Sequence, residues 1–131
     1  MEGLFSREWV VHFSKRWNAS IDMRGPLAAA NFDAVIALGF IDEINPAVLL
    51  EVKSGKVIRA GLYDARYSSA INWDLRAAPG HWAEWKKEGL GISGLGLAVS
   101  SGHLQFKTGD YRKMIRQPGL AGPFLTFFTL I

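Results

Sequence analysis

Cysteine is absent from this chain of 131 residues. That absence excludes a disulfide framework, a thiolate metal site and a cysteine nucleophile. Long apolar runs are absent too, because no stretch approaches the roughly 20 residues that a membrane-spanning helix needs. The beginning of the chain lacks the basic start and apolar run of a secretory signal peptide, since Glu2, Arg7 and Glu8 interrupt it. We therefore expect a cytoplasmic protein.

Charge is absent from the last fifteen residues, 117–131, which we call the C-terminal segment. The segment reads QPGLAGPFLTFFTLI and contains three apolar pairs, at 124–125, 127–128 and 130–131. Burying a Leu, Ile or Phe side chain gains roughly 1.5–3 kcal/mol over leaving it in water. We therefore expect the C-terminal segment to cover an apolar surface: the core of the protein, a partner, a membrane or a lipid.

The remaining composition is that of an ordinary globular protein. Hydrophobic residues make up 49% of the chain and charged residues 21%, which is far from the disordered class. The length suits one hydrophobic core, so we expect a single domain over residues 1–131. Fifteen basic residues against 12 acidic ones give a net charge of +3. This mild excess does not indicate a nucleic-acid partner.

The first half of the chain predicts helices followed by strands. Aromatic residues recur every four positions from Phe5 to Trp17, which predicts an amphipathic helix over about 7–18 with Ser6 as its N-cap. Gly25-Pro26 is expected to break the chain before a short helix at 27–30. Strands are then predicted at 32–41, 47–53 and 57–63, forming an antiparallel meander, and at 70–75, with one wet face.

The second half predicts mostly helices. One covers 81–88, a loose glycine-rich helix covers 90–101, a fifth strand covers 103–108, and Asp110 caps a helix at 111–117. The apolar pattern resumes near Leu120, with a break or kink at Pro123. The order predicts an α+β fold, in which helices pack on one face of a mostly antiparallel five-stranded sheet.

Three local motifs follow one another in a recognisable order. Residues 5–9 (FSREW) open the first helix, residues 50–57 (LEVKSGKV) form a strand, a turn and a strand, and residues 102–110 (GHLQFKTGD) lead from a strand into a helix. In order and spacing the chain resembles the sterol-carrier-protein type 2, or non-specific lipid-transfer, family. The resemblance implies that sheet and helices enclose an apolar tunnel for a fatty acyl chain, acyl-CoA or sterol, closed at one end by the C-terminal helix.

The resemblance implies a lipid-binding domain without catalytic residues, cofactor or metal. Its expected apolar walls are Phe13, Trp17, Trp82, Trp85, Leu95, Leu97, Met114, Phe124, Phe127 and Phe128. Met and aromatic side chains adapt well to variable apolar ligands. Arg112, Lys113 and Arg116 are candidates for attracting an anionic head group, although a solvated helix face is the favoured interpretation. The expected partners are a lipid, a transient membrane surface and a second copy bound through the C-terminal segment.

Two glycine-rich stretches resemble a dinucleotide-binding motif and a nucleophile elbow, but neither meets the requirements of its motif. Residues 89–94 match G-x-G-x-x-G, but a dinucleotide site requires a preceding strand, and here a helix is predicted. Residues 91–95 miss the last glycine of the G-x-S-x-G nucleophile elbow. For residues 89–94 we expect a flexible apolar loop.

The titratable residues leave weaker alternatives open. His12, His81 and His103 lack metal-ligand spacing, and His81 at a helix start is the one of most interest. Asp64 and Asp74 could form a carboxylate pair, but solvated charges at strand ends are the favoured interpretation. A small enzyme with His81 or Asp74 as acid or base therefore stays an alternative. So does a non-catalytic interaction module whose C-terminal segment fills the cavity or forms a homodimer.

Overall fold

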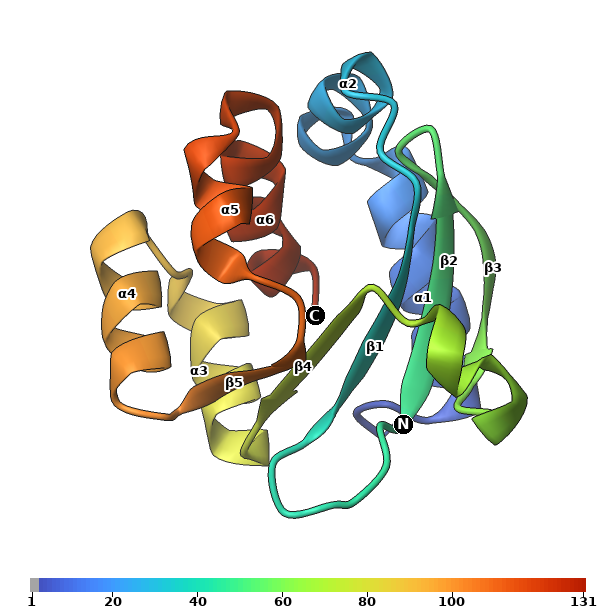
Figure 1. Ribbon diagram of the computed structural model, residues 1–131, viewed down its shortest axis with the longest axis vertical. Coiled ribbons are helices and arrows are strands. Elements are labelled where there is room, and N and C mark those ends of the chain that lie inside the picture. Colours follow the sequence, from blue (N-terminus) through green and yellow to red (C-terminus); the bar gives the residue numbers. More distant parts are fainter. Residues whose placement is uncertain (1–2) are drawn as a thin grey trace.

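The computed structural model describes residues 3–131 (Figure 1). Its elements alternate between helices and strands along the chain. They are α1 (Arg7–Ala19), α2 (Ile21–Ala29), β1 (Ala34–Phe40), β2 (Val48–Lys53), β3 (Lys56–Leu62), η1 (Ala65–Ala70, a 3-10 helix), β4 (Trp73–Ala77), α3 (Pro79–Glu88), α4 (Ile92–Ser100), β5 (Leu104–Thr108), α5 (Tyr111–Arg116) and α6 (Pro118–Leu130).

The five strands form one sheet in the order β3-β2-β1-β4-β5. Strands β1, β2 and β3 pair antiparallel as the predicted meander, β4 pairs parallel with β1, and β5 pairs antiparallel with β4. After β3 the chain crosses back through η1 to place β4 beside β1. The predicted α+β class with a mostly antiparallel sheet is confirmed.

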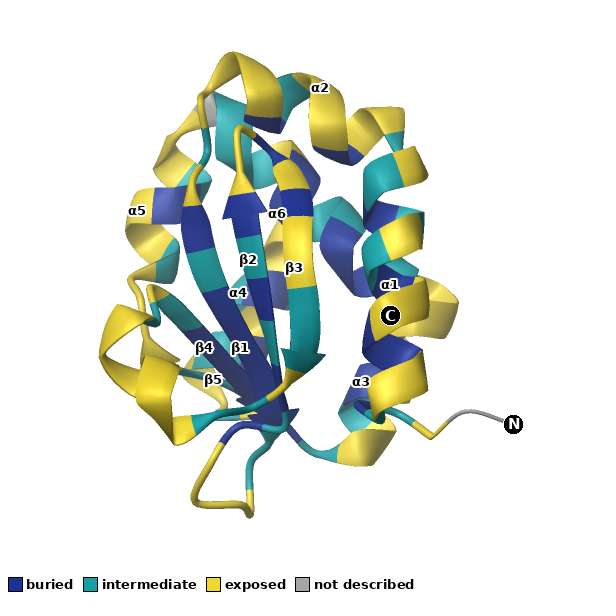
Figure 2. Cartoon of the chain, turned by 90° about the vertical axis from the view of Figure 1, so that its right-hand side faces the viewer, coloured by how far each residue is buried: buried dark blue, intermediate teal, exposed yellow. Residues whose placement is uncertain are grey.

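Helices α1, α2, α3 and α6 cover one face of the sheet, which we call the inner face (Figures 1 and 2). Its strand residues are buried against them, among them Ile36, Leu38, Leu50 and Leu75. The opposite, outer face is partly covered by η1 and by the loop between β1 and β2. The hydrophobic core therefore lies between the inner face and the four helices.

Helix α1 is fixed to the sheet by both apolar and polar contacts. The Ser6 hydroxyl accepts a hydrogen bond from the Trp9 N–H at 3.1 Å, which caps the helix as predicted. The aromatic row along α1 is buried, with the Trp9 and Phe13 rings stacked 4.9 Å apart. The Trp17 indole N–H donates to the Gly55 carbonyl at 2.9 Å, so the helix end is tied to the β2–β3 turn. Helix and hairpin thus form one unit.

The β2–β3 turn depends on a glycine. Ser54 and Gly55 have φ values of 49° and 79°, the left-handed pair that a two-residue hairpin of this type requires. A Cβ atom on Gly55 would lie 2.6 Å from the backbone nitrogen of Ala28 in α2. Only glycine therefore lets the turn pack against this helix.

The predicted break at Gly25-Pro26 is wrong. Helix α2 starts at Ile21, where the Ser20 hydroxyl accepts from the Met23 N–H at 3.3 Å, and it continues through Pro26. A proline inside a helix removes one intrahelical hydrogen bond. Here Met23 and Leu27, four residues apart, are both buried in the core, and this packing outweighs the local preference of Gly-Pro.

The prediction of a wet face on the fourth strand is also wrong. Strand β4 covers 73–77, and residues 74–77 are all buried. Asp74 and Arg76 point to the outer face, where the Arg76 Nε atom donates to an Asp74 carboxylate oxygen at 2.6 Å. Arg76 also donates to the Glu43 carbonyl at 2.8 Å. The β1–β2 loop therefore covers this ion pair, and Asp74 is not a solvated strand-end charge.

Asp64 does not pair with Asp74 either. Its carboxylate accepts from the Arg66 side chain at 2.7 Å and from the Arg66 backbone N–H at 3.0 Å. The hydrogen bonds from Arg66 hold the pKa of Asp64 below its ordinary value. Asp64 thus acts as the N-cap of η1.

The other predicted elements are found within two residues of their expected bounds. The Asp110 carboxylate caps α5 by accepting from the Arg112 N–H at 2.9 Å. Helix α6 begins at Pro118, earlier than the expected Leu120, and includes Pro123. The C-terminal segment is thus almost entirely helical.

A candidate ligand site beneath the C-terminal helix

Helix α6 brings the aromatic residues of the C-terminal segment into the core. Phe124, Phe127 and Phe128 are all buried. The Phe127 ring lies 5.5 Å from that of Phe13 in α1, edge to face, and Phe128 packs 5.5 Å from Trp85 in α3. Such aromatic pairs stabilise a core beyond their buried area. The C-terminal segment therefore covers the core of its own chain.

An apolar pocket remains between α6, α2 and the inner face of the sheet. Every residue lining it is apolar. They are Trp17, Met23, Leu27, Phe32, Ile36, Trp73, Leu75, Met114, Leu120, Pro123, Phe124 and Phe127. The open volume is about 30 Å³, whereas a single water molecule needs roughly 10–15 Å³. The side chains of α6 thus fill most of the space between helices and sheet.

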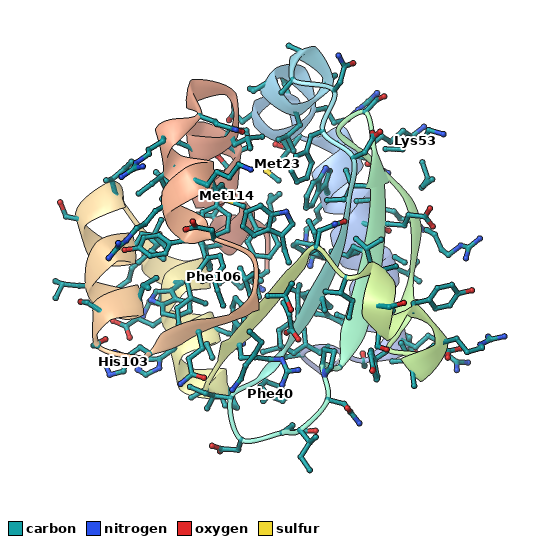
Figure 3. The ribbon with its side chains drawn as sticks, viewed as in Figure 1. Met23, Phe40, Lys53, His103, Phe106 and Met114 are labelled. Carbon is teal, nitrogen blue, oxygen red and sulfur yellow. The ribbon has the colours of Figure 1, made fainter. Side chains whose placement is uncertain are left out.

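Two methionines from different helices meet at this pocket. Met23 belongs to α2 and Met114 to α5, and both are buried. Figure 3 shows them on facing sides of the space between these helices. Because methionine is unbranched and flexible, this wall can change shape at low cost.

Helix α6 lies close to α2 near its start and is hydrogen-bonded to α1 at its end. Near its start, a Cβ atom placed on Gly119 would lie 3.6 Å from the Ala30 Cβ atom at the end of α2. At its other end, the Arg16 Nε atom in α1 donates to the Leu130 carbonyl at 2.7 Å. A cation at the last turn also complements the helix dipole. The hydrogen bond from Arg16 and the aromatic packing therefore set the resistance of α6 to displacement.

The structure brings together only part of the predicted wall. Of the ten residues, Trp17, Met114, Phe124 and Phe127 line the pocket. Five others are buried in the same core away from it: Phe13, Trp82, Trp85, Leu95 and Phe128. The prediction for Leu97 is corrected, since this residue is 69% exposed. On α4 it lies on the side opposite the buried Leu95 and Ala98, as the 100° step of a helix dictates.

Several pocket residues were missed from the sequence. They are Met23, Leu27, Phe32, Ile36, Trp73, Leu75, Leu120 and Pro123. The four-residue spacing of Met23 and Leu27 was a usable signal for a buried helix face, but the Gly-Pro pair between them concealed it. The strand residues come from β1 and β4, whose parallel pairing no local pattern reveals.

The predicted head-group residues lie on the surface. Arg112, Lys113 and Arg116 are exposed on α5, and Met114 of the same helix faces the pocket. Helix α5 therefore connects the pocket to a basic part of the surface.

His81 and His103 come together, which their separation of 22 residues did not predict. Their rings stack with centroids 4.2 Å apart, and His81 also stacks on Trp85. Among residues 3–131, the buried Nδ1 atom of His81 finds no hydrogen-bond partner. Within the same range, no three His, Asp or Glu side chains gather where they could hold a metal ion. Neither His81 nor Asp74 lines the apolar pocket.

The glycine-rich motif follows α3, so the strand that a dinucleotide site requires is not at this position. Gly89 ends α3, and Ser93 lies exposed in the first turn of α4. Across the described residues, none of the helices is both long and apolar enough to span a bilayer.

Comparison with known proteins rests on structure alone. No protein-family model matches the chain, and no curated protein matches it. A crystal structure of sterol carrier protein 2 superposes with a TM-score of 0.70, covering 97% of this chain and 98% of the other at 18% identity. The chain has the sterol carrier protein 2 fold.

Two further structures share this sterol-carrier fold. A solution structure of a conserved hypothetical protein from Thermus thermophilus, described as possibly a sterol carrier protein, has a TM-score of 0.67 and 18% identity, covering 97% of this chain and 88% of that one. A ubiquinone synthesis protein called UbiJ-SCP2 has a TM-score of 0.58 and 12% identity, with coverages of 90% and 83%. The resemblance noted from the sequence motifs is confirmed at the level of the fold.

Proposed function

We propose that this protein binds and transfers an apolar ligand, such as a fatty acyl chain, acyl-CoA, sterol or similar lipid, between α6 and the sheet. The observation that carries the proposal is the wholly apolar lining of the pocket, with α6 as one wall, in a sterol-carrier fold. Lipid binding of this kind is driven by burial of alkyl groups, about 0.8 kcal/mol for each CH₂.

Binding requires α6 to move. Sites for small molecules typically enclose roughly 300–1,000 Å³, and the pocket has an open volume of about 30 Å³. If Phe124, Phe127 and Phe128 had to leave the core, the cost would be roughly 5–9 kcal/mol. An acyl chain that buries about twelve CH₂ groups gains about 10 kcal/mol. A long chain can therefore displace α6, and a short chain cannot.

The absence of cysteine makes a direct test available. The 3.6 Å between the Ala30 Cβ atom and a Cβ on Gly119 falls within the roughly 3.5–4.5 Å of natural disulfides. In the double variant Ala30→Cys/Gly119→Cys, the disulfide would lock α6 against α2. We expect binding of a fluorescent acyl probe to be lost in the oxidised form and restored by reduction. The two single-cysteine variants serve as controls, and equal binding by the oxidised and reduced forms would contradict displacement of α6.

A second candidate is a non-catalytic interaction module whose C-terminal segment fills the cavity permanently. The small open volume and the buried aromatic residues of α6 favour it. Organic extraction of the purified protein followed by lipid mass spectrometry separates the two candidates. A protein that yields no lipid, and whose wild-type form ignores acyl probes, would support the interaction module. A homodimer through α6 would first have to expose side chains that are now in the core.

A further inference from the structure

A second pocket lies beyond the end of α6, between α1 and α3 (Figure 2). We call it the α1–α3 pocket. Its lining residues are Leu4, Trp9, Arg16, Ala83, Lys86 and Ile131. Its open volume is about 240 Å³, whereas the apolar pocket beneath α6 has about 30 Å³. A small molecule can therefore enter the α1–α3 pocket without any displacement of α6.

The α1–α3 pocket combines an apolar lining with two cations. Arg16 and Lys86 are its charged residues, the other lining residues are apolar, and no acidic side chain lines it. Arg16 is half-buried and Lys86 is exposed. Among residues 3–131, neither cation forms an ion pair with a carboxylate. Two positive charges beside an apolar wall suit an anion that has an apolar body.

The guanidinium of Arg16 is held in place and keeps donors available for such a ligand. A guanidinium carries five N–H donors, and the Nε atom of Arg16 donates to the Leu130 carbonyl at 2.7 Å. Its central carbon lies 5.8 Å from the centre of the Phe13 ring. Within the described part of the chain, the two Nη atoms have no hydrogen-bond partner. A pair of parallel N–H donors can bind both oxygens of a carboxylate.

We propose that the α1–α3 pocket binds a small organic carboxylate, and that this ligand holds α6 in place. The carboxylate binds the Nη atoms of Arg16 beside Lys86, and the apolar body contacts Trp9 and Ile131. Ile131 lines the pocket only while α6 is packed on the core. The ligand therefore binds the packed state better than the displaced state, so it must stabilise the packed state.

This site does not rest on the proposed function, because carboxylate binding requires no ligand in the apolar pocket. If α6 is also the part that moves for a lipid, the two ligands oppose each other. Linkage then requires that each lowers the affinity of the other by the same factor.

Titration with benzoate, followed by the NMR signal of the Trp9 indole N–H, tests the site. Trp9→Phe identifies this signal among the five tryptophans. Benzamide has the same ring without the charge, and we expect it to bind at least about tenfold more weakly than benzoate. Arg16→Gln should weaken benzoate binding by at least about tenfold, and Lys86→Gln by about twofold to fivefold. Added salt should weaken it as well.

Two neighbouring lysines supply matched controls. Lys15→Gln and Lys87→Gln each remove one positive charge next to a lining residue, but neither Lys15 nor Lys87 lines the pocket. Both variants should bind benzoate almost as the wild type does. Arg16→Gln also removes the anchor of α6, so Lys86→Gln against Lys87→Gln is the comparison that leaves this anchor intact. Thermal unfolding checks that every variant is folded.

Hydrogen exchange tests the effect on α6. At a benzoate concentration about ten times its Kd, exchange of α6 amides through displacement of the helix should slow about tenfold. Benzamide at the same concentration should leave the exchange nearly unchanged. A wild type that ignores benzoate, binds benzamide equally well, or loses no more affinity in Lys86→Gln than in Lys87→Gln would overturn the site. Benzoate binding without slower exchange would overturn its hold on α6. Neither readout uses an acyl probe, so failure here is distinct from failure of the proposed lipid binding.

Discussion

The buried ion pair of Asp74 and Arg76 should dominate stability at the level of single residues. Removing one partner of a buried pair leaves an uncompensated charge and costs roughly 3–5 kcal/mol. We therefore expect Asp74→Ala to lower the free energy of unfolding by about this amount, measured by urea denaturation. The double variant Asp74→Leu/Arg76→Met should lose less than the single one. A loss under about 1 kcal/mol for Asp74→Ala would contradict the burial of the pair.

Alanine substitutions at Gly55 and Gly102 separate the stability cost of backbone strain from the cost of close packing. Gly55 and Gly102 have similar positive φ values, 79° and 83°, but only a Cβ on Gly55 would collide with a neighbour. Gly102→Ala should therefore cost only the strain, about 1 kcal/mol. Gly55→Ala should cost clearly more, because α2 must move. Thermal melting of the two variants provides the measurement, and equal losses would show that α2 does not confine the turn.

Residue types alone predicted several of these roles and missed others. The caps Ser6 and Asp110 were predictable, because their hydrogen bonds are local. The pairing of Asp74 with Arg76 was not, because an alternating strand reads as half-exposed and only the β1–β2 loop makes its polar side buried. The stacked His81 and His103 depend in the same way on distant elements that meet in the fold.

At the level of elements, the anchor of α6 links stability to ligand binding. Arg16→Ala removes the donor to the Leu130 carbonyl and should weaken the attachment of α6 by about 1 kcal/mol. Hydrogen exchange in α6 should rise. Affinity for an acyl probe should rise by up to about fivefold, because opening becomes easier.

Lys15→Ala is the control for this prediction, since Lys15 is exposed on the same helix. Faster exchange in α6 without any gain in probe affinity would separate the motion of α6 from ligand binding and contradict the proposed entry of the ligand.

Helices and strands with a clear hydrophobic periodicity were predictable from the sequence. Those whose structure depends on packing against distant elements were not. The aromatic row predicted α1, and the turn at 54–55 predicted the β2–β3 hairpin. Helix α2 contradicted its local Gly-Pro signal because Met23 and Leu27 are buried. The candidate site was the hardest part to predict from the sequence, because its lining residues come from α1, α2, β1, β4, α5 and α6.

At the level of the whole molecule, ligand binding should depend on chain length. Each added CH₂ buried beneath α6 should tighten binding about fourfold, until the chain fills the available space. A series of saturated fatty acids that compete with a fluorescent acyl probe measures this dependence. Short acids should fail to compete because they cannot offset the exposure of the α6 aromatic residues. An affinity independent of chain length would place the probe outside the apolar pocket.

The edge strand β3 has a feature that affects how the protein behaves at high concentration. The Asn18 side chain accepts from the Val57 N–H at 2.9 Å and donates to the Val57 carbonyl at 3.0 Å. These are the backbone groups that a strand from another molecule would use to extend the sheet. Asn18 therefore occupies the position of an added strand at Val57, so the start of the β3 edge is closed to the sheet extension that builds fibrous aggregates.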